Sequence, residues 1–387
     1  MGLGRRRVLY CILTLTALFC LAPSAPRTCA QQPPSQTPDP QPTQPKPDPT
    51  LLRRPPPKPP SLLIPTGKIL LDAIVTDSSG KPIAGLQPWD FKLLDNDHPA
   101  KILSFRSYDG ATVLPDPPVQ VILLIDELNL PITEISFVRS QLAAFLRQNN
   151  GHLAQPATIF LLTETGLQIQ PRPSTDGNAL LAVLNQIKPH ISSINPAMGS
   201  QGALERTQIS VRQLAAIAEN EARKPGRKLL LWIGPGWPML QSRNFEFNER
   251  DRRADFDLIV ELTNRLREAR IVLSSVAPLD SAMGAGTHDV LYQAFLKGVR
   301  TPQQADIGNL SLKVLVTNTG GKILGPDNDL TGQINRCIAD ANAFYSLSFN
   351  PPQADHADEF HDITLQIDRP GAIVRTNTAY YNQPPGN

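Results

Sequence analysis

The stretch that decides the fold is residues 119–130, which read VQVILLIDELNL. Residues 119–125 are almost continuously apolar, which is typical of a strand buried on both faces of a sheet. The run ends at Asp126, and residues 135–146 then carry apolar side chains at helical spacing. A buried strand that leads into an amphipathic helix is the beginning of a strand–helix–strand unit. The segment therefore predicts an α/β fold with Asp126 at the carboxyl end of a strand.

The same alternation continues toward the C-terminus. Buried-strand patterns occupy residues 157–162, 228–233 and 271–276, and helical patterns lie between and after them, over residues 180–187, 211–218, 259–266 and 334–341. Ser174 or Thr175 is expected to cap the first of these helices, and Thr207 to open the second. Strands that alternate with helices predict parallel pairing, with helices over both faces of the sheet. We assign residues 117–342 to this α/β domain.

Two segments with strand-like alternation flank the α/β domain. In residues 67–112, apolar side chains occupy every second position from 69 to 75, and two shorter strand patterns follow. In residues 343–382 the alternation returns at 345–349 and again at 363–367. Each set of short strands lacks a partner face and would make a poor domain alone. We therefore expect one small, discontinuous β-sandwich-like domain, into which the α/β domain is inserted.

The N-terminus has the pattern of a secretory signal peptide. Arg5–Arg7 precede an apolar run from Val8 to Ala22, which is short for a membrane span. Cleavage after Ala30 would remove residues 1–30 and leave no transmembrane segment, and an uncleaved anchor is the alternative. Residues 31–66 contain 14 prolines, a composition that cannot bury a core and predicts a disordered linker. The mature protein is therefore expected to be secreted, to the periplasm or to the cell surface.

Cleavage would also change the charge and the cysteine content. It would remove four arginines and no acidic residue, so the formal net charge would change from +2 to −2. Because a chain without a basic excess is a poor nucleic-acid binder, we expect a protein or cell-envelope partner instead. Of the four cysteines only Cys337 would remain, which excludes an intramolecular disulfide. Cys337 lies on the apolar face of the last predicted helix and is expected to be a core thiol.

No familiar catalytic motif is present. The sequence contains no HExxH, GxSxG, Walker A or paired-cysteine motif, so we expect that the protein is not an enzyme. Residues 95–98 and 327–329 look like fragments of calcium loops but lack the glycine and glutamate that complete such loops, so turns and helix caps are expected there. His356 and His361 fall in a polar stretch, for which a loop is favoured over a zinc site.

Several stretches, taken in order, resemble the VWFA-related domain of acidobacterial envelope proteins, a von Willebrand factor type A-like (vWA-like) family. They are VTDSSGKPIAGLQPWDFKLLDNDHPAKILSF (75–105), VILLIDELN (121–129), PGRKLLLWIGPGWP (225–238), TGGKIL (319–324) and FYSLSFNPP (344–352). The resemblance covers most of residues 67–382. It implies a Rossmann-like vWA fold, a mostly parallel sheet flanked by helices, with its site at the carboxyl ends of the strands.

The resemblance also implies where a metal would bind. In the general family, Asp-x-Ser-x-Ser after the first strand, a Thr from a later loop and an Asp from a further strand hold Mg²⁺. Here Asp126 matches the leading Asp, but Leu128 and Leu130 stand at the two Ser positions. Thr207 is the best match for the loop Thr, and residues 232–237 offer no second Asp. The chain would therefore carry a degenerate metal-ion-dependent adhesion site.

Two other side chains could supply replacement oxygens. With Asn129 and Glu164 added, the tentative metal ligands are Asp126, Asn129, Thr207 and Glu164, for Mg²⁺ or alternatively Ca²⁺ or Mn²⁺. The alternative is that Asp126 and Asn129 only fix the loop and cap the next helix through local hydrogen bonds.

Glu127 and Trp237 are expected at the same rim. An exposed Trp237 would be a natural interface anchor, whereas local packing is the other interpretation. The sequence thus favours a secreted or envelope-tethered protein of binding or adhesion type, which recognises its partner through this rim. A metal-free vWA scaffold for an envelope assembly is the alternative, and a secreted hydrolase is a third, less favoured hypothesis.

Overall fold

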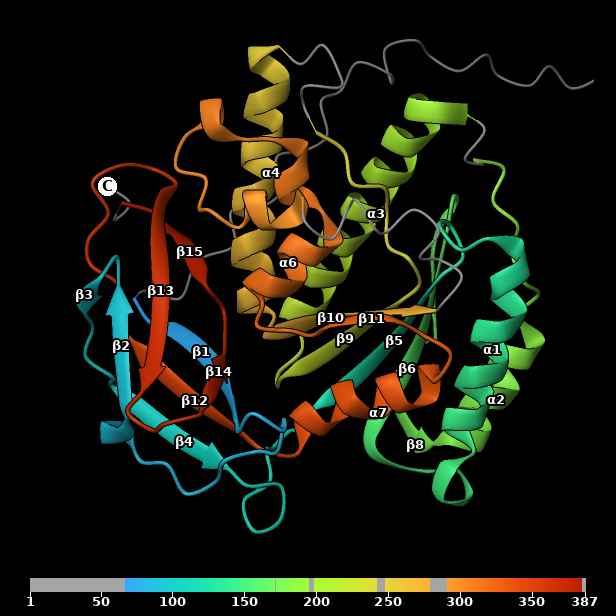
Figure 1. Ribbon diagram of the computed structural model, residues 1–387, viewed down its shortest axis with the longest axis horizontal. Helices are drawn as coiled ribbons and strands as arrows, with labels where there is room; N and C mark the ends of the chain where they lie inside the picture. The colour runs from blue at the N-terminus through green and yellow to red at the C-terminus, as the bar shows by residue number, and fades with distance from the viewer. Residues whose placement is uncertain (1–66, 171, 195–197, 242–247, 279–290, 385–387) are drawn as a thin grey trace, which may run out of the picture. The chain divides into compact units, whose positions relative to one another are not determined.

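A seven-stranded, mostly parallel sheet forms the centre of the α/β part in the computed structural model of the chain (Figure 1). The structure describes residues 67–170, 172–194, 198–241, 248–278 and 291–384. The strand order is β11-β10-β9-β5-β6-β7, and β8 also pairs with β6. Only β7 and β8 run antiparallel to their neighbour β6. The strands are β5 (Gln120–Asp126), β6 (His152–Thr163), β7 (Gly166–Ile169), β8 (Ser174–Asp176), β9 (Lys228–Ile233), β10 (Ile271–Pro278) and β11 (Ile323–Asp327).

Helices cover both faces of this sheet, as the sequence predicts. They are α1 (Ile132–Leu146), α2 (Gly177–Gln186), α3 (Gly199–Ala222), α4 (Glu249–Glu268), α6 (Leu312–Asn318) and α7 (Leu330–Ile338). The core residues of α3, α4 and α6 pack with Ile122 and Leu124 of β5. Those of α1, α2 and α7 pack with Val121, Leu123 and Ile125 on the other face. Alternate residues of one apolar strand thus enter two different cores, which explains why residues 121–125 are apolar without interruption.

Two helix starts differ from the prediction. Asp176, not Ser174 or Thr175, caps α2, because its side chain accepts a hydrogen bond from the backbone N of Ala179 at 3.0 Å. Helix α3 begins at Gly199, so Thr207 lies within the helix instead of opening it. The first turns of α3 are rich in polar and small residues, and an apolar stripe marks the helix only from its middle onward.

The flanking segments form two four-stranded antiparallel sheets with orders β14-β1-β12-β4 and β15-β13-β2-β3. Both sheets combine strands from before and after the α/β part, as the pairings of Ile69 in β1 with Phe349 in β12 and of Leu93 in β2 with Leu365 in β13 illustrate. One core lies between the sheets and contains residues of β1, β2, β12, β13 and β15. The strands are β1 (Ile69–Thr76), β2 (Phe91–Asp95), β3 (His98–Pro99), β4 (Ser104–Tyr108), β12 (Phe344–Phe349), β13 (Glu359–Ile367), β14 (Ile373–Arg375) and β15 (Ala379–Asn382).

Buried charges join the sandwich to the α/β part. The guanidinium of Arg270, just before β10, donates to both carboxylate oxygens of Asp72 in β1, at 2.7 and 3.0 Å. Arg227, just before β9, is buried and lies 4.5 Å from the ring centroid of Phe344. The described residues between 67 and 384 accordingly belong to one compact unit, although two kinds of sheet are present.

Three further expectations concern the N-terminal segments, membrane-spanning helices and Cys337. Residues 1–30 and 31–66, assigned to a signal peptide and a linker, lie outside the described residues. In the described part of the chain, no helix is both long and apolar enough to cross a bilayer. The prediction for Cys337 is confirmed, since its side chain is buried and burial raises the pKa of its thiol to about 11.

Short 3₁₀ helices lie at Pro88–Asp90, Gln148–Gly151, Tyr292–Phe295, Pro302–Gln304, Ile307–Leu310 and Ala339–Ala341.

Candidate functional site

The topology of the large sheet singles out the carboxyl ends of β5 and β9. From β5 the chain continues to β6 on one side of the sheet, whereas from β9 it continues to β10 on the other side. Open α/β sheets bind ligands outside the carboxyl ends of their strands at such a switch point. Asp126 ends β5 and Gly234 directly follows β9. The rim expected from the sequence therefore lies at the place where the fold most favours a site.

Asp126 is fully buried at this switch point, and both of its carboxylate oxygens accept hydrogen bonds. The indole N–H of Trp232 donates to Oδ2 at 2.7 Å. The amide Nδ2 of Asn129 donates to Oδ1 at 2.9 Å and to Oδ2 at 3.0 Å, and the backbone N of Asn129 donates to Oδ1 at 3.1 Å. The carboxylate is thus enclosed by neutral donors from the following loop and the neighbouring strand.

The absence of a close cation affects the acidity of Asp126. Among the described residues, no Lys, Arg or His forms an ion pair with its carboxylate. Burial raises the pKa of Asp126 to about 6, although the hydrogen bonds from Trp232 and Asn129 and the charge of Arg206 partly oppose that rise. The carboxyl therefore loses its proton close to physiological pH, as buried groups at functional sites often do.

The residues at this rim do not fit the Mg²⁺ site that the resemblance implies. Leu128 and Leu130, at the two Ser positions, are buried in the cores on opposite faces of the sheet. Gly234 lies where a second Asp would be needed, and a Cβ there would come within 2.9 Å of the Cβ of Asp126. Asn129 Oδ1 has no hydrogen-bond partner among the described residues, but one neutral oxygen does not replace this set. A metal would have to displace Trp232 or Asn129 from Asp126.

The other two tentative ligands hold protein segments together. Thr207 donates to the carbonyl oxygens of Ala203 at 2.9 Å and Pro238 at 3.3 Å. Glu164, in the turn after β6, accepts hydrogen bonds from the hydroxyl of Ser192 at 2.8 Å and the backbone N of Ser193 at 2.7 Å. Of the four tentative ligands, only Asp126 and Asn129 are in contact.

The electrostatics of Glu164 agree with this structural role. Partial burial alone would raise the pKa of Glu164, but hydrogen bonds from Ser192 and Ser193 lower it below its ordinary value. Across the described ranges, no three His, Cys, Asp or Glu side chains are grouped so that they could hold a metal ion.

The two residues assigned to the binding rim are buried, which corrects that prediction. Glu127 is 0% exposed and accepts hydrogen bonds from the guanidinium of Arg139 at 2.9 Å and the backbone N of His190 at 2.8 Å. Trp237 is 5% exposed, and its indole N–H donates to the carbonyl oxygen of Leu310 at 3.1 Å. The ring of Trp237 packs edge-on against that of Trp232, with centroids 5.0 Å apart. Trp237 therefore packs locally, which was the alternative interpretation of this residue.

The sequence did not reveal Trp232 as the partner of Asp126, because the pairing of two strands places the two side chains together. In the parallel pairing of β5 with β9, Trp232 is the partner of Leu124. Side chains two residues apart on a strand share a face, so Trp232 lies on the same face as Asp126. The register of two strands is needed to see this, and a single sequence does not supply it.

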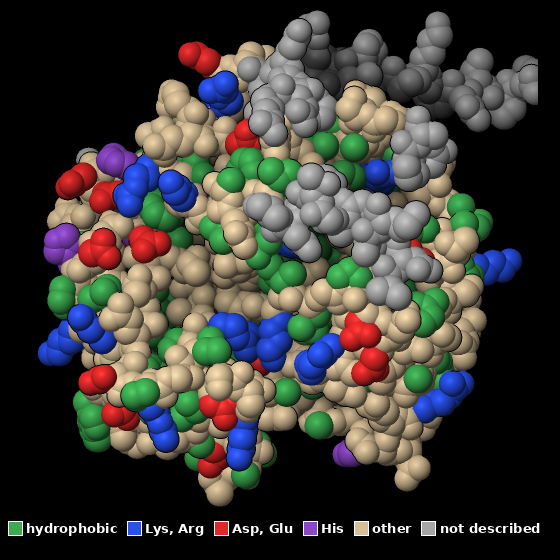
Figure 2. Space-filling view, in the orientation of Figure 1, with side chains coloured by type: hydrophobic (Ala, Val, Ile, Leu, Met, Phe, Trp, Pro, Cys, Tyr) green, Lys and Arg blue, Asp and Glu red, His purple; other side chains and the backbone are tan. Residues whose placement is uncertain are grey.

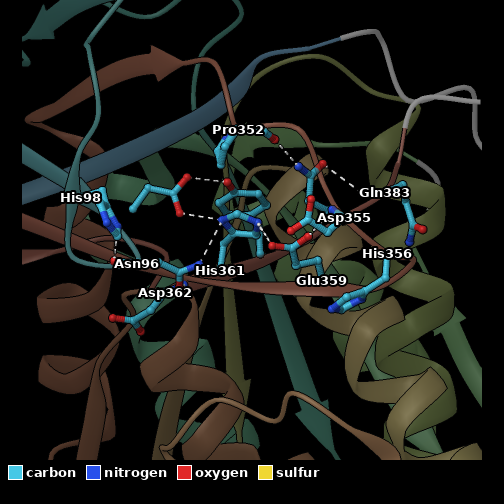
Figure 3. A network of polar contacts seen from close by, with 12 residues as sticks. Asn96, His98, Pro352, Asp355, His356, Glu359, His361, Asp362 and Gln383 are labelled. Atoms are coloured by element: carbon cyan, nitrogen blue, oxygen red, sulfur yellow. Dashed lines mark hydrogen bonds and ion pairs between the residues drawn. The ribbon is translucent and has the colours of Figure 1, made fainter.

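A second polar network, which the sequence did not suggest, lies inside the sandwich (Figure 3). His361 is in β13 and is 2% exposed, whereas a polar loop was expected. Its Nδ1 lies 2.7 Å from Oδ1 of Asp95, and the hydroxyl of Tyr380 donates to Oδ2 of Asp95 at 2.6 Å. On the other side of the ring, Nε2 of His361 lies 3.5 Å from Oε1 of Glu359. These contacts close the end of the sandwich with a hydrogen-bonded core and do not form a metal site.

Around the closed rim, two large apolar side chains are exposed, one at the start of α1 and one on a loop. Ile132, the first residue of α1, is 57% exposed, and Ile191 is 62% exposed. Ile191 lies between His190, whose backbone N is bound to Glu127, and Ser192, whose hydroxyl is bound to Glu164. These bonds hold Ile191 over the carboxyl ends of β5 and β6. The rim therefore presents apolar side chains outside a buried polar centre.

Two solved structures illustrate what the chain is similar to. No protein-family model matches the chain, and no curated protein matches it. The crystal structure of the human COPII-coat protein Sec24c is similar with a TM-score of 0.32 and 11% identity, over 70% of this chain and 44% of that one. The pilus adhesin SpaC from Lactobacillus rhamnosus GG is similar with a TM-score of 0.32 and 10% identity, over 76% of this chain and 48% of that one. The chain spans less than half the length of either structure, and likenesses at this TM-score support no argument about function.

Proposed function

We propose that the chain is a secreted, vWA-like binding protein that recognises a protein of the cell envelope without a metal ion. The observation that carries the proposal is the closure of Asp126, whose two oxygens are occupied by Trp232 and Asn129. A carboxylate held in this way stabilises the rim. Its oxygens are not available to coordinate a cation that the protein would share with its partner. We also propose that the protein is not an enzyme, because its sequence carries no familiar catalytic motif.

Features of the large sheet support the vWA-like assignment. Numbered within the α/β part, the six strands of the main path have the order 6-5-4-1-2-3, with the order reversing beside the first strand. Asp126 ends that first strand, where the family has its leading Asp. Secretion rests on the sequence pattern of residues 1–30, and tethering to the envelope rests on the proline-rich composition of residues 31–66.

The exposed side chains of the rim are the surface through which we propose that binding occurs. Ile132 and Ile191 are large, apolar and exposed beside a rigid, hydrogen-bonded base. Apolar side chains at the centre of an interface contribute much of its affinity when the partner removes them from water. No charged pair or metal is needed for such an interface.

The test combines cation titration with partner capture. Calorimetric titration of the mature protein with Mg²⁺, Mn²⁺ and Ca²⁺ should give no binding heat, for the parent chain or for Asp126→Ala. Cross-linking to an envelope fraction from the source cells should give the same discrete protein adduct in EDTA and in Mg²⁺. The double variant Ile132→Asp/Ile191→Asp should lose that adduct, while Ile373→Asp should keep it, since Ile373 is 49% exposed but lies on β14 of the sandwich.

Three results would contradict the proposal. Cation binding that disappears in Asp126→Ala would restore a metal-dependent site. An adduct that persists in the rim double variant would place the interface on another surface, as in the scaffold hypothesis. Binding to envelope polysaccharide in place of protein would change the class of partner.

A further inference from the structure

A cavity of about 310 Å³ lies between the sandwich and the α/β part. None of the rim residues lines it. Its walls come from α4, α6 and residues 295–299 on one side and from β13, β15 and nearby residues on the other. Figure 2 shows the surface hollowed between β13 and α6. Pockets for small molecules often lie between substructures of a protein, and this volume is at the lower end of their usual range.

Part of the cavity wall is apolar, and specific contacts hold that part in place. Phe360 and Tyr381 pack with ring centroids 5.4 Å apart, and the hydroxyl of Tyr381 donates to the carbonyl oxygen of Val299 at 2.7 Å. Gly298 lies directly against Phe360, since a Cβ there would come within 2.0 Å of the ring. Phe295 adds a third ring to the lining. The cavity is therefore formed before any ligand enters, which lowers the entropic cost of binding.

Two opposite charges line the cavity without being paired to each other. Asp362 and Lys297 are both exposed, and neither forms an ion pair within the part of the chain that the structure describes. Asp362 follows His361 in β13 and points away from the His361 network, toward the opposite face of the strand (Figure 3). Partial burial raises the pKa of Asp362 and the charge of Asp97 raises it further, whereas the charge of Arg300 opposes the rise. A cation bound at Asp362 would offset the effects of burial and of Asp97.

We propose that this cavity binds a free apolar α-amino acid. The aliphatic or aromatic side chain would enter among Phe295, Phe360 and Tyr381. The ammonium group would pair with Asp362 and the carboxylate with Lys297. This ligand class uses the apolar walls and both unpaired charges, whereas a neutral apolar molecule would leave the two charges without partners.

The test uses three probes of the same shape with the full-length mature protein. L-phenylalanine carries both charges, phenethylamine lacks the carboxylate, and 3-phenylpropionate lacks the ammonium. Calorimetry should show L-phenylalanine binding about fivefold more tightly than either analogue, which is the upper range for one partly exposed ion pair. Asp362→Asn should remove the advantage over 3-phenylpropionate, and Lys297→Gln should remove the advantage over phenethylamine.

Two further variants show whether the cavity itself is the site. Thr263→Trp would place a large ring from α4 into the space and should abolish binding of all three probes. Asp97→Asn removes a carboxylate that does not line the cavity and should change affinity much less than Asp362→Asn. Failure of all three probes to bind at millimolar concentration would overturn the proposal, as would unchanged binding in Thr263→Trp or equal effects of the two Asp variants. None of these outcomes depends on the rim, so the proposed function is tested separately.

Discussion

At the scale of single residues, the defining feature is a carboxylate kept in the protein interior by neutral donors. The indole of Trp232 and the amide of Asn129 satisfy Asp126, but neither carries a positive charge. Ionised Asp126 therefore keeps its hydrogen bonds and still loses much of its hydration. This imbalance raises the pKa of Asp126 to about 6 in the folded state.

The stability of the fold should depend on pH through Asp126. Its folded-state pKa, about 6, lies above the ordinary aspartate pKa of 3.8, so its contribution to stability is fully present below pH 3.8. That contribution is lost as the pH rises through 6. The loss amounts to about 3 kcal/mol, because a tenfold change in the protonation equilibrium corresponds to about 1.4 kcal/mol. Urea unfolding of the parent chain and of Asp126→Asn, from pH 4 to pH 8, measures this loss.

The comparison with Asp126→Asn removes the contributions of other titrating groups. The unfolding free energy of the parent chain minus that of the variant should fall as the pH rises, mainly between pH 4 and pH 6.5. Parallel profiles for the two chains would show that Asp126 has an ordinary pKa in the folded protein.

At the scale of elements, the strands and helices of the α/β part could be predicted because each apolar run is long and periodic. The short edge strands β7, β8 and β11 and the short helix α6 were not predicted, because tertiary pairing stabilises them more than their own sequences do. The start of α3 was missed for a related reason, since its first turns contribute few side chains to the core. Candidate residues were placed on the correct edge of the sheet, but their partners depend on strand register and loop path.

Strand β1 of the sandwich is linked to the α/β part through Asp72, which pairs with Arg227 and Arg270. Replacing Asp72 with Asn should lower the unfolding free energy by about 3 to 5 kcal/mol, because Arg227 and Arg270 would lose their compensating charge in a largely buried setting. The matched control is Asp257→Asn, which breaks an exposed pair with Arg253 and should cost less than about 1 kcal/mol. If both variants lost similar unfolding free energy, the Asp72 pairs would not be what joins the sandwich to the α/β part.

At the scale of the whole molecule, the discontinuous sandwich was predictable because each flanking segment needed a partner. The pairing of β1 with β12 and of β2 with β13 supplies that partner from the opposite end of the chain. The sequence did not show how closely the sandwich is joined to the α/β part, because that contact depends on arginines at the starts of β9 and β10. Ion pairs between residues far apart in sequence have no periodicity that a single chain reveals.

Unfolding of the whole protein should therefore be one cooperative event. Deleting residues 67–109 should be as damaging as deleting residues 343–382, because each deletion removes strands from both sandwich sheets. Calorimetry and far-ultraviolet circular dichroism check this expectation. A shortened chain that still melts with a sharp transition would show that the α/β part does not need the sandwich.

The pairing of Tyr108 with Phe344 has a mechanical consequence. These two residues are partners across β4 and β12, with stacked rings whose centroids lie 4.5 Å apart, so the chain leaves the sandwich and returns to it at one point. A force applied between Gly67 and Pro384 acts first on β1 and β15, and the backbone of the inserted α/β part is not extended while β4 remains joined to β12. Under tension between its two ends, the protein would yield in the sandwich before the loops around Asp126 carried any load.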